Sequence, residues 1–413
     1  MTGTRSERTL LLLVSAVQFV NVLDFVMVMP LGPDFAASLG IPMSRLGLVT
    51  GSYTLAAAAA GIAGSSFLDR FDRRSALAVA MAGLVAATAA GGFSTGLGTL
   101  LASRVAAGLF GGPATSLSFA IVADAVPPER RGRAMGVVMG AFSVAAVLGV
   151  PAGLWMAQVA GWRAPFLAAA ALGVVVAGAS LVLMPRMTAH LHDPSSAGRR
   201  GYAFLRDPAA LLSLSATGST MLASFALVPN LAAFLQFNAG WPRERLGTLY
   251  LLGGLLSFAV LRVVGRAVDR FGAPRVAAAG TSILVANMAL GIAPARPLLP
   301  AWGIFLLFIL ANSLRNPALS SLASRVPLPA ERARFQSTQS AVQHLASAAG
   351  ALLSSVLLAT GADGALVGTW RVAALSGLAG CALPVLLSLV EPRVRRREAT
   401  RAGAAALAPE DGI

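Results

Sequence analysis

The sequence predicts an all-α membrane protein in which twelve transmembrane helices form two pseudo-symmetric six-helix bundles. Hydrophobic residues make up 56% of the 413 positions and charged residues 12%, and the mean hydropathy is +0.74. Twelve apolar stretches are each long enough to cross a hydrocarbon core about 30 Å thick. Because backbone groups in lipid must be paired within the chain, such stretches form helices. A polar loop between two of them also recurs 200 residues later.

The order of the elements follows from the apolar stretches and the polar segments between them. The expected membrane helices are 9–31, 46–67, 75–94, 97–123, 134–159, 164–184, 209–236, 246–265, 275–293, 300–322, 334–359 and 369–390. The expected domains are an N-terminal bundle (1–185), a cytoplasmic linker (186–206), a C-terminal bundle (207–392) and a cytoplasmic tail (393–413). In the linker, we expect His190 and His192 to be solvated rather than to bind metal. The tail is expected to lie unstructured against lipid head groups.

The recurring loop divides the chain into two copies of one unit. The polar segment 65–74 follows one hydrophobic stretch, and segment 265–275 follows its counterpart, with Asp-Arg-Phe at the same place in both. A second echo relates 131–133 to 332–334, at an offset of 201 residues. Internal repeats of membrane helices are typical of transporters.

The distribution of arginine predicts the topology. All 32 basic residues are arginine and the net charge is +15. If the N-terminus is cytoplasmic, most arginines fall in cytoplasmic segments. The exceptions are Arg45, Arg163, Arg243, Arg245, Arg296 and Arg371 on the outer side, and Arg104, Arg262 and Arg315 within helices. Excess cytoplasmic arginine places both termini in the cytoplasm and explains the net charge without a nucleic-acid partner. The alanine- and glycine-rich, lysine-free composition favours a bacterial inner membrane.

The first apolar stretch argues against a signal peptide, and the single cysteine argues against a disulfide or cysteine–metal scaffold. Residues 10–31 contain Asp24 and Pro30 and lack a small-residue cleavage site, so we expect a retained helix rather than a signal peptide. One cysteine, Cys381, allows neither a disulfide scaffold nor a cysteine-ligated metal within the chain.

Four short motifs lie in register with the predicted helices. They are Ser65, Asp69, Arg70, Arg73 and Arg74 after helix two, Arg104 with Gly108 in helix four, Gly149-Val150-Pro151-Ala152-Gly153 in helix five, and Leu23-Asp24 leading to Pro30 and Pro33 in helix one. The first resembles the Gly-x-x-x-Asp-Arg-x-Gly-Arg-Arg signature of the major facilitator superfamily. Ser65 and Asp72 replace two of its glycines, which the second copy keeps as Gly265 and Gly272.

The resemblance covers essentially the whole chain and carries functional expectations. Helix one looks like that of the drug:proton antiporters in the sugar and drug efflux branch. In such proteins the helix-four arginine belongs to the proton-coupling machinery, which implies that role for Arg104. Gly149, Pro151 and Gly153 look like the motif that marks antiporters. The fold implied is that of two bundles working by alternating access.

Asp24 and Arg104 are the candidate proton-coupling residues. At 1.5 Å rise per residue, Asp24 lies within about 5 Å of the bilayer midplane, and Arg104 reaches nearly the same depth. A carboxylate there costs about 2.5–3.5 kcal/mol and needs a partner or a proton. We therefore predict that the two side chains communicate, with protonation of Asp24 loosening the pair. The alternatives are a fixed ion pair joining helices one and four, or a snorkelling arginine.

A second set of charges is predicted to act as a conformational latch. Asp69, Arg70, Arg73 and Arg74 lie at a helix end and can pair with Asp124, while Asp269 and Arg270 form the second-half copy. Such pairs would hold the cytoplasmic side closed. Alternatively, the arginines only set the topology. Likewise, Gly149, Pro151 and Gly153 can serve antiport or simply tight helix packing.

The candidate substrate pocket is mostly apolar and aromatic. Its predicted members are Phe19, Asn21, Phe25, Phe225, Asn230, Phe234, Gln236, Gln339, Gln343 and His344. A cavity of this composition suits lipophilic or weakly polar compounds. The amides can equally join helices, and a lone histidine such as His344 is more often structural. Arg315 either contacts an anionic substrate or pairs within helix ten.

Together these features predict a secondary transporter that exports a small organic compound in exchange for protons. Its expected partners are the small-molecule substrate, protons and the lipid bilayer, with no nucleic acid, and the chain is expected to be a monomer. We expect no cofactor, since the proton gradient supplies the energy and no nucleotide-binding loop is evident. The sequence shows no nucleophile–base pair or metal-ligand cluster in the helices, so we do not expect an enzyme. A sugar or metabolite exporter or importer of the same fold, and a non-transporting membrane sensor, stay open.

Overall fold

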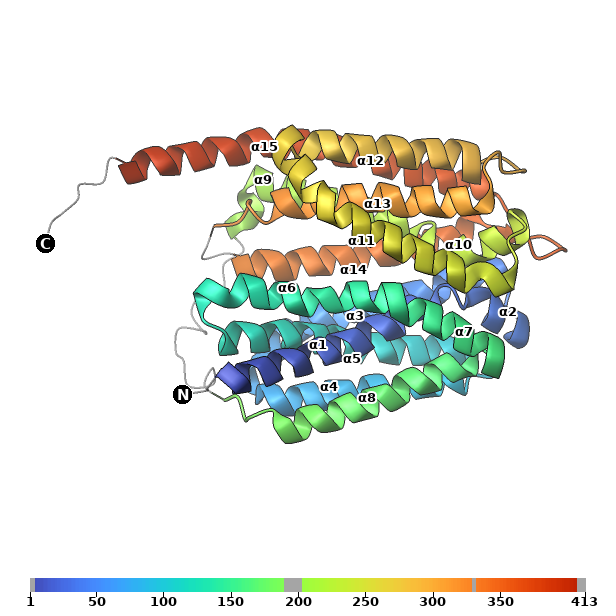
Figure 1. The fold of residues 1–413 in the computed structure, drawn as a ribbon, viewed down its shortest axis with the longest axis horizontal. Coiled ribbons are helices and arrows are strands. Elements are labelled where there is room, and N and C mark those ends of the chain that lie inside the picture. Colours follow the sequence, from blue (N-terminus) through green and yellow to red (C-terminus); the bar gives the residue numbers. More distant parts are fainter. Residues whose placement is uncertain (1–3, 189–202, 329–331, 407–413) are drawn as a thin grey trace, which may run out of the picture.

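The computed structural model describes residues 4–188, 203–328 and 332–406. In this part of the chain, twelve helical spans are long and apolar enough to cross a membrane, which confirms the predicted all-α fold. The spans run side by side, and the start of the first and the end of the last lie on the same side of the molecule (Figure 1). We call this side the terminal side and the opposite one the far side.

The first bundle contains the elements up to residue 183. Its helices are α1 (Thr4–Val28), α2 (Gly32–Leu39), α3 (Leu46–Phe67), α4 (Arg73–Gly92), α5 (Leu97–Ala125), α6 (Pro128–Val144), α7 (Val150–Ala160) and α8 (Arg163–Leu183), with short turns η1 (Met43–Arg45) and η2 (Leu68–Arg70). A π-helical turn, η3 (Ala145–Gly149), joins α6 and α7 into one span. It ends two residues before Pro151, whose missing N–H cannot continue the regular bonding pattern.

The second bundle repeats this plan. Its helices are α9 (Pro208–Phe225), α10 (Val228–Ala233), α11 (Leu246–Phe271), α12 (Ala273–Asn287), α13 (Ala301–Ala323), α14 (Arg332–Leu357) and α15 (Thr369–Ala406), with turns η6 (Ala203–Arg206), η7 (Phe234–Asn238), η8 (Arg243–Arg245) and η9 (Met288–Ile292). A small antiparallel hairpin, β1 (Ala359–Thr360) and β2 (Leu366–Val367), precedes α15, with Ala359 opposite Val367.

Three predicted boundaries are wrong for identifiable reasons. The helix expected over 246–265 continues to Phe271, so Asp269 and Arg270 lie on α11, which ends where Gly272 has a φ of 86°. The first span ends at Val28 rather than 31, since Met29 precedes Pro30 and the residue before a proline disfavours the helical region. The tail expected to be unstructured continues α15 to Ala406, past Pro392. Ion pairs of Arg397 with Asp207, the N-cap of α9, and of Glu398 with Arg325 hold this extension to the bundle. His190 and His192 of the linker lie outside the described residues.

Three hydrophobic cores show how the bundles meet. One core lies wholly within the first bundle and another wholly within the second. The third combines residues of both, including Phe35 and Leu46 with Phe234 and Leu249, and these lie in far-side segments. Burial of apolar area therefore joins the two bundles at the far side.

The helices at this seam are in close contact near the far side, and side chains further along them become exposed. A Cβ atom added at Gly47 of α3 would lie 2.1 Å from the carbonyl oxygen of Ala351 in α14. Two turns further along α3, Leu55 is 46% exposed, and Leu345 of α14 is 45% exposed. On the other edge of the seam, a Cβ at Gly254 of α11 would approach Val147 Cα to 3.0 Å. The structure is thus closed at the far side.

Candidate functional site

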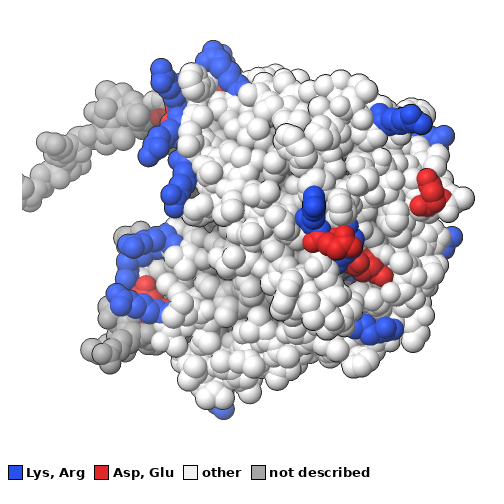
Figure 2. All heavy atoms as spheres, turned by 45° about the vertical axis from the view of Figure 1, so that its right-hand side comes forward, with Lys and Arg blue, Asp and Glu red and all other residues white. Residues whose placement is uncertain are grey.

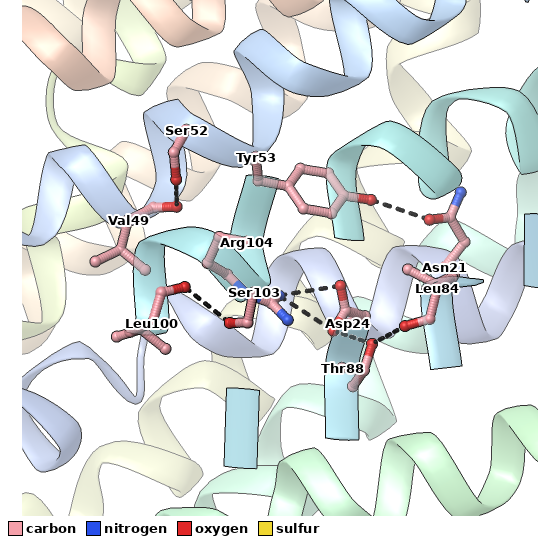
Figure 3. A network of polar contacts seen from close by, with 10 residues as sticks. All are labelled: Asn21, Asp24, Val49, Ser52, Tyr53, Leu84, Thr88, Leu100, Ser103 and Arg104. Carbon is pink, nitrogen blue, oxygen red and sulfur yellow. Dashed lines mark hydrogen bonds and ion pairs between the residues drawn. The ribbon is translucent and has the colours of Figure 1, made fainter. Parts of the chain in front are cut away.

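A buried ion pair in the first bundle joins the two residues predicted to couple protons. Nη1 of Arg104 lies 3.1 Å from both carboxylate oxygens of Asp24 (Figure 3). Asp24 is 0% and Arg104 1% exposed. The hydroxyl of Thr88 on α4 donates to Asp24 Oδ1 at 2.8 Å. The sequence-based expectation that helices one and four meet at this depth is therefore matched by a direct contact.

Arg104 is held by more than this carboxylate. Its guanidinium carbon lies 5.3 Å from the ring centroid of Phe166 on α8, within cation–π range. Gly91 leaves room for the guanidinium, since a Cβ there would be 3.3 Å from Nη2. Nε and Nη2 of Arg104 have no hydrogen-bond partner among the described residues. The guanidinium thus retains unused donors that a rearranged carboxylate can accept.

One turn before Asp24, a second polar group ties α1 to its neighbours. Asn21 Nδ2 donates to the carbonyl of Gly111 at 3.0 Å and to Thr115 Oγ1 at 2.6 Å. Its Oδ1 accepts a hydrogen bond from the hydroxyl of Tyr53, also at 3.0 Å. Asn21 and Tyr53 are both buried, and Figure 3 shows the hydrogen bond between them. Asn21, predicted as a pocket residue, links helices in this conformation.

Two predicted pocket residues meet across the seam between the bundles. Phe25 of α1 stacks on Phe225 of α9, with ring centroids 5.9 Å apart and an interplanar angle of 22°. Phe25 also stacks on Tyr53, with ring centroids 5.1 Å apart. Phe25 and Phe225 are half-buried. They form an aromatic bridge next to the Asp24 ion pair.

The remaining pocket candidates do not share one cavity. Asn230 donates to Ser354 Oγ at 2.8 Å, and Phe234 is buried in the far-side core. Both line a small void of about 10 Å³. Within the second bundle, Gln339 donates to Thr217 Oγ1 at 3.2 Å. The others are half-buried on their helices: Phe19 on α1, Gln236 on η7, and Gln343 and His344 on α14.

The predicted latch residues are only partly brought together. Arg73 Nε lies 3.2 Å from Asp124 Oδ2, which joins α4 to α5 inside the first bundle and does not cross the seam. Arg74 donates to the carbonyl of Met184 at 3.3 Å. The side chain of Asp69 lies outside the described residues, and the described ones include no ion-pair partner for Arg70.

The second-half copy of the latch is arranged differently. Asp269 and Arg270 are exposed, and neither takes part in an ion pair with a described residue. Arg270 lies over the ring of Phe271 at 5.3 Å. The position 201 residues after Asp124 is Arg325, which pairs with Glu398 instead. The sequence repeat does not extend to the charge pairing.

Asp72, which replaces a glycine of the family motif, caps α4. Its Oδ2 accepts from the backbone and hydroxyl of Ser75, and its Oδ1 accepts from the Met187 N–H at 2.7 Å. Burial alone would raise the pKa of the Asp72 carboxyl, but these hydrogen bonds hold it below its usual value. A carboxyl whose pKa is lowered by folding stabilises the protein above its unfolded pKa of about 3.9.

We expect Asp72→Ala to lower the stability of the purified protein by about 1–2 kcal/mol at pH 7. The difference from wild type should fade as the pH falls through the lowered pKa, because the cap is then protonated in both folded and unfolded chains. Thermal unfolding in detergent at a series of pH values measures it. Asp269→Ala, which removes an exposed carboxylate, serves as the control. A difference that grows in acid would contradict the assignment.

The predicted antiporter motif packs against α1 beside the ion pair. A Cβ at Gly149 would come within 2.5 Å of Leu23 Cδ1, so a larger residue there would require the flexible tip of Leu23 to shift. Pro151 lies in the first turn of α7, and its carbonyl faces Gly247 of α11 across the seam. At Gly153 an added Cβ would make only an ordinary van der Waals contact, 3.8 Å from Met27 Cβ. Of the two glycines of this motif, Gly149 therefore makes the closer contact with α1.

Arg315 lies inside the second bundle and not at the seam. It is fully buried, and its three guanidinium nitrogens lack hydrogen-bond partners among the described residues. Its stem fills the space beside Gly280, where a Cβ would approach Cγ to 2.8 Å. Its Nη2 lies 3.6 Å from the Cβ position of Gly380. Arg315 is thus enclosed by α12, α13 and α15.

An ion pair that the sequence did not suggest joins the bundles at the far side. Arg243 of η8 binds Asp34 of α2 through two hydrogen bonds, Nε–Oδ1 at 2.7 Å and Nη2–Oδ2 at 2.6 Å. Gln158 donates to the carbonyls of Arg243 and Glu244, and the hydroxyl of Thr360 bridges to Ser44. Figure 2 shows this side with its own group of acidic and basic side chains, separated by uncharged surface from the basic terminal side.

We expect Asp34→Asn to weaken far-side closure by about 1 kcal/mol, a roughly fivefold shift between closed and open forms. The pair is bidentate and only 19% and 23% exposed, so it exceeds an ordinary surface pair. Spin labels at Ala160→Cys and Ala295→Cys, in a Cys381→Ser background, report the far-side distance. Arg45→Gln is the control, and the swap of Asp34→Arg with Arg243→Asp should restore closure. Equal distances in all variants would exclude a role for the pair.

Sequence reasoning missed residues whose importance depends on orientation. Thr88, Tyr53 and Phe166 surround the ion pair, but a threonine or an aromatic residue in an apolar helix does not reveal which way it points. The only available signal is Thr88, a polar residue near the middle of an otherwise apolar stretch. Among the described residues, no group of three or more His, Cys, Asp or Glu side chains is placed to hold a metal ion.

Two related helix bundles closed at one side, with a paired carboxylate buried in the membrane region, define a secondary transporter. The chain belongs to the Major Facilitator Superfamily, whose sequence model matches residues 14–351. It is accordingly a multi-pass membrane transporter and not an enzyme. The resemblance inferred from the four motifs is confirmed.

Relatives and solved structures agree with this membership. A chloramphenicol resistance protein of Streptomyces lividans is 29% identical over 352 residues, covering 84% of this chain and 88% of that protein. The purine ribonucleoside efflux pump NepI of Escherichia coli O157:H7 is 26% identical over 270 residues, covering 64% and 66%. A bacterial homologue of the human lysosomal transporter Spinster, in an inward-facing, unoccupied conformation, shares the fold with a TM-score of 0.70 at 14% identity, covering 95% and 96%. A D-xylose–proton symporter does so with a TM-score of 0.68 at 16% identity, covering 92% and 96%.

Proposed function

We propose that this transporter exports a small lipophilic or weakly polar organic compound by alternating access, in exchange for protons. The observation that carries the proposal is the Asp24–Arg104 pair, which is fully buried at membrane depth and braced by Thr88. A buried carboxylate with one cationic partner has two stable states, a charged paired state and a protonated state. The names of two relatives, a chloramphenicol resistance protein and a nucleoside efflux pump, support export.

In this proposal, the side of the molecule that is open determines when Asp24 binds or releases its proton. With the far side closed, substrate and Asp24 communicate with the terminal side, where Asp24 releases its proton and pairs with Arg104. Once the far side opens, a proton arriving from that side neutralises Asp24 and releases Arg104, which favours return after the substrate has left. One proton entering along a potential of 100 mV supplies about 2.3 kcal/mol for this cycle.

The orientation is part of the proposal. The arginine-rich terminal side would face the cytoplasm of a bacterium and the far side the exterior, so both termini would be cytoplasmic. The Arg73–Asp124 pair and its neighbours would act on the terminal side when that side closes. Each bundle has its own core and the seam joins the two within one chain, which supports a functional monomer.

Proton flux in reconstituted vesicles tests the exchange. Vesicles with an internal pH dye would receive chloramphenicol, a purine ribonucleoside, a lipophilic cation and a sugar, for wild type and Asp24→Asn. We expect substrate-dependent proton movement in wild type and a fall to the level of empty vesicles in Asp24→Asn. Asp363→Asn, an exposed carboxylate near the far-side hairpin, should behave as wild type.

The pattern of responding compounds separates the candidates. A response to the purine ribonucleoside but not to the cation would favour a metabolite exporter, the second candidate, which the NepI relative supports. Proton flux that survives Asp24→Asn would show that Asp24 does not carry the exchanged proton. Substrate movement without any proton movement would reject exchange, and no movement of any compound would reject export of these classes.

A further inference from the structure

Phe25 and Phe225 are equivalent residues of the two bundles. They are 200 positions apart, the same offset that relates the repeated polar loops. The residues before them, Asp24 and Ser224, correspond in the same way, and each binds a side chain of the fourth helix in its own bundle. Asp24 binds Arg104, and Ser224 donates to Asn312 Oδ1 at 2.8 Å. The two rings therefore approach each other across the pseudo-symmetry axis of the molecule.

The stacked arrangement joins one face of each ring. The Phe25 and Phe225 rings are nearly parallel, at 22° and 5.9 Å. Tyr53 stacks on Phe25 at 5.1 Å and is itself held by its hydrogen bond to Asn21. Phe25 is thus backed by a fixed partner, while its contact with Phe225 is made between bundles that move during transport.

The backbone beside both rings is interrupted. Helix α9 ends at Phe225, and α10 begins three residues later at Val228, followed by Pro229. Helix α1 likewise ends at Val28, three residues after Phe25. Breaks in membrane helices are tolerated where the chain is buried in protein or lines a cavity, and they are common at transporter binding sites. The rings thus lie at the end of a regular helix in each bundle.

On the terminal side of this aromatic pair, side chains of the seam helices become exposed. The far-side halves of α3 and α14 are in van der Waals contact at Gly51 and Leu352, whereas Leu55 and Leu345 are exposed. A compound that entered between the bundles from the terminal side would meet half-buried aromatic rings near the closed end. A ring inserted between Phe25 and Phe225 would increase their centroid separation from 5.9 Å to about 9 Å, twice the shortest stacking separation, so the two bundles would have to move apart there.

We infer that Phe25 and Phe225 form the two walls of an aromatic slot that holds a planar aromatic ring of the transported compound. The inference rests on the proposed function, in which the seam is the transport pathway. Insertion would replace the contact between Phe25 and Phe225 by one contact from each ring to the substrate. An aromatic substrate would then link the two bundles itself. Since Phe25 directly follows Asp24, a shift of Phe25 also displaces the segment of α1 that carries the ion pair.

Binding in detergent, without any gradient, tests the slot. The probes are N-(2-naphthylmethyl)acetamide and its decahydro analogue, which share one carbon skeleton and differ in the aromaticity and planarity of the rings. Binding is measured by saturation-transfer NMR titration. We expect the naphthyl probe to bind wild type at least fivefold more tightly than the saturated one. Phe25→Leu and Phe225→Leu should each weaken the naphthyl probe by roughly three- to tenfold and the saturated probe by less than twofold.

Two further variants keep the test decisive. Phe225→Tyr retains the ring and should bind the naphthyl probe within about twofold of wild type, whereas Phe93→Leu removes an exposed ring elsewhere and should change nothing. Equal binding of the two probes, or unchanged binding in both leucine variants, would overturn the slot. If the binding pattern holds while proton flux is absent, proton-coupled export is wrong and the slot stands. If flux depends on Asp24 while the leucine variants bind normally, the slot alone is wrong.

Discussion

Replacing Arg104 by glutamine is expected to destabilise the folded protein by about 3–5 kcal/mol. The substitution leaves the carboxylate of Asp24 buried without its cation, and an unpaired buried charge is among the most destabilising defects a fold can carry. Thr88 alone can offer Asp24 a single neutral hydrogen bond. In Asp24→Asn, by contrast, the guanidinium keeps its contact with the Phe166 ring, and its loss of stability should be smaller.

The double variant Asp24→Asn with Arg104→Gln distinguishes an ion pair from two independent residues. It should recover most of the stability lost in Arg104→Gln, since neither charge is then buried alone, yet it should lack substrate-driven proton movement. Thermal unfolding and yield of the purified monodisperse protein measure the first effect. The control is Arg163→Gln, which removes the arginine that lies over the ring of Trp162 at the start of α8, on the far side. A double variant no more stable than Arg104→Gln would show that the pair is not the source of the loss.

The contact between Asp24 and Arg104 could be predicted from the depth of the two residues in the membrane and from their opposite charges. Twelve apolar stretches define the spans, and a constant rise per residue places both charges near the same level. Charged groups in lipid seldom remain unpaired, so depth and sign together suffice. The details around the pair depend on rotation about each helix axis, which apolar sequences leave undetermined. Thr88, Phe166 and Gly91 could therefore be found only in three dimensions.

The predicted pocket shows the same limit more clearly. Amides in membrane helices can face a substrate or another helix, and composition does not distinguish the two. Asn21, Asn230 and Gln339 all bond to neighbouring helices in this conformation. Phe25 and Phe225 could have been singled out, because their offset of 200 residues matches the repeat. Comparing the two halves residue by residue carries more information than listing polar side chains.

That comparison also separates the roles of the bundles. In the first bundle, helices one and four are joined by the charged pair of Asp24 and Arg104. In the second, the corresponding helices are joined by the neutral pair of Ser224 and Asn312. Protonation can change only the first of these. In the proposed exchange, the proton would therefore act on the first of these two pairs.

Gly47→Ala is expected to prevent the far side from closing fully. The added methyl group would lie 2.1 Å from the carbonyl oxygen of Ala351 and 2.5 Å from the hydroxyls of Ser354 and Ser355. A backbone carbonyl cannot swing aside as a flexible side chain can, so α3 and α14 must separate by roughly 1 Å or more. The population should move toward the far-side-open form, and transport should slow because one of the two alternating states is destabilised.

A graded series along α3 makes this expectation specific. At Gly51 an added Cβ would approach the flexible tip of Leu352 at 2.9 Å, and at Gly61 it would meet no atom within 4 Å. The far-side distance between spin labels at Ala160→Cys and Ala295→Cys should therefore increase most in Gly47→Ala, less in Gly51→Ala and not at all in Gly61→Ala. Alanine is otherwise the better helix former by roughly 0.5–1 kcal/mol, so Gly61→Ala should be at least as stable as wild type. An equal response at all three positions would mean that helix propensity, and not the closed seam between α3 and α14, determines the effect.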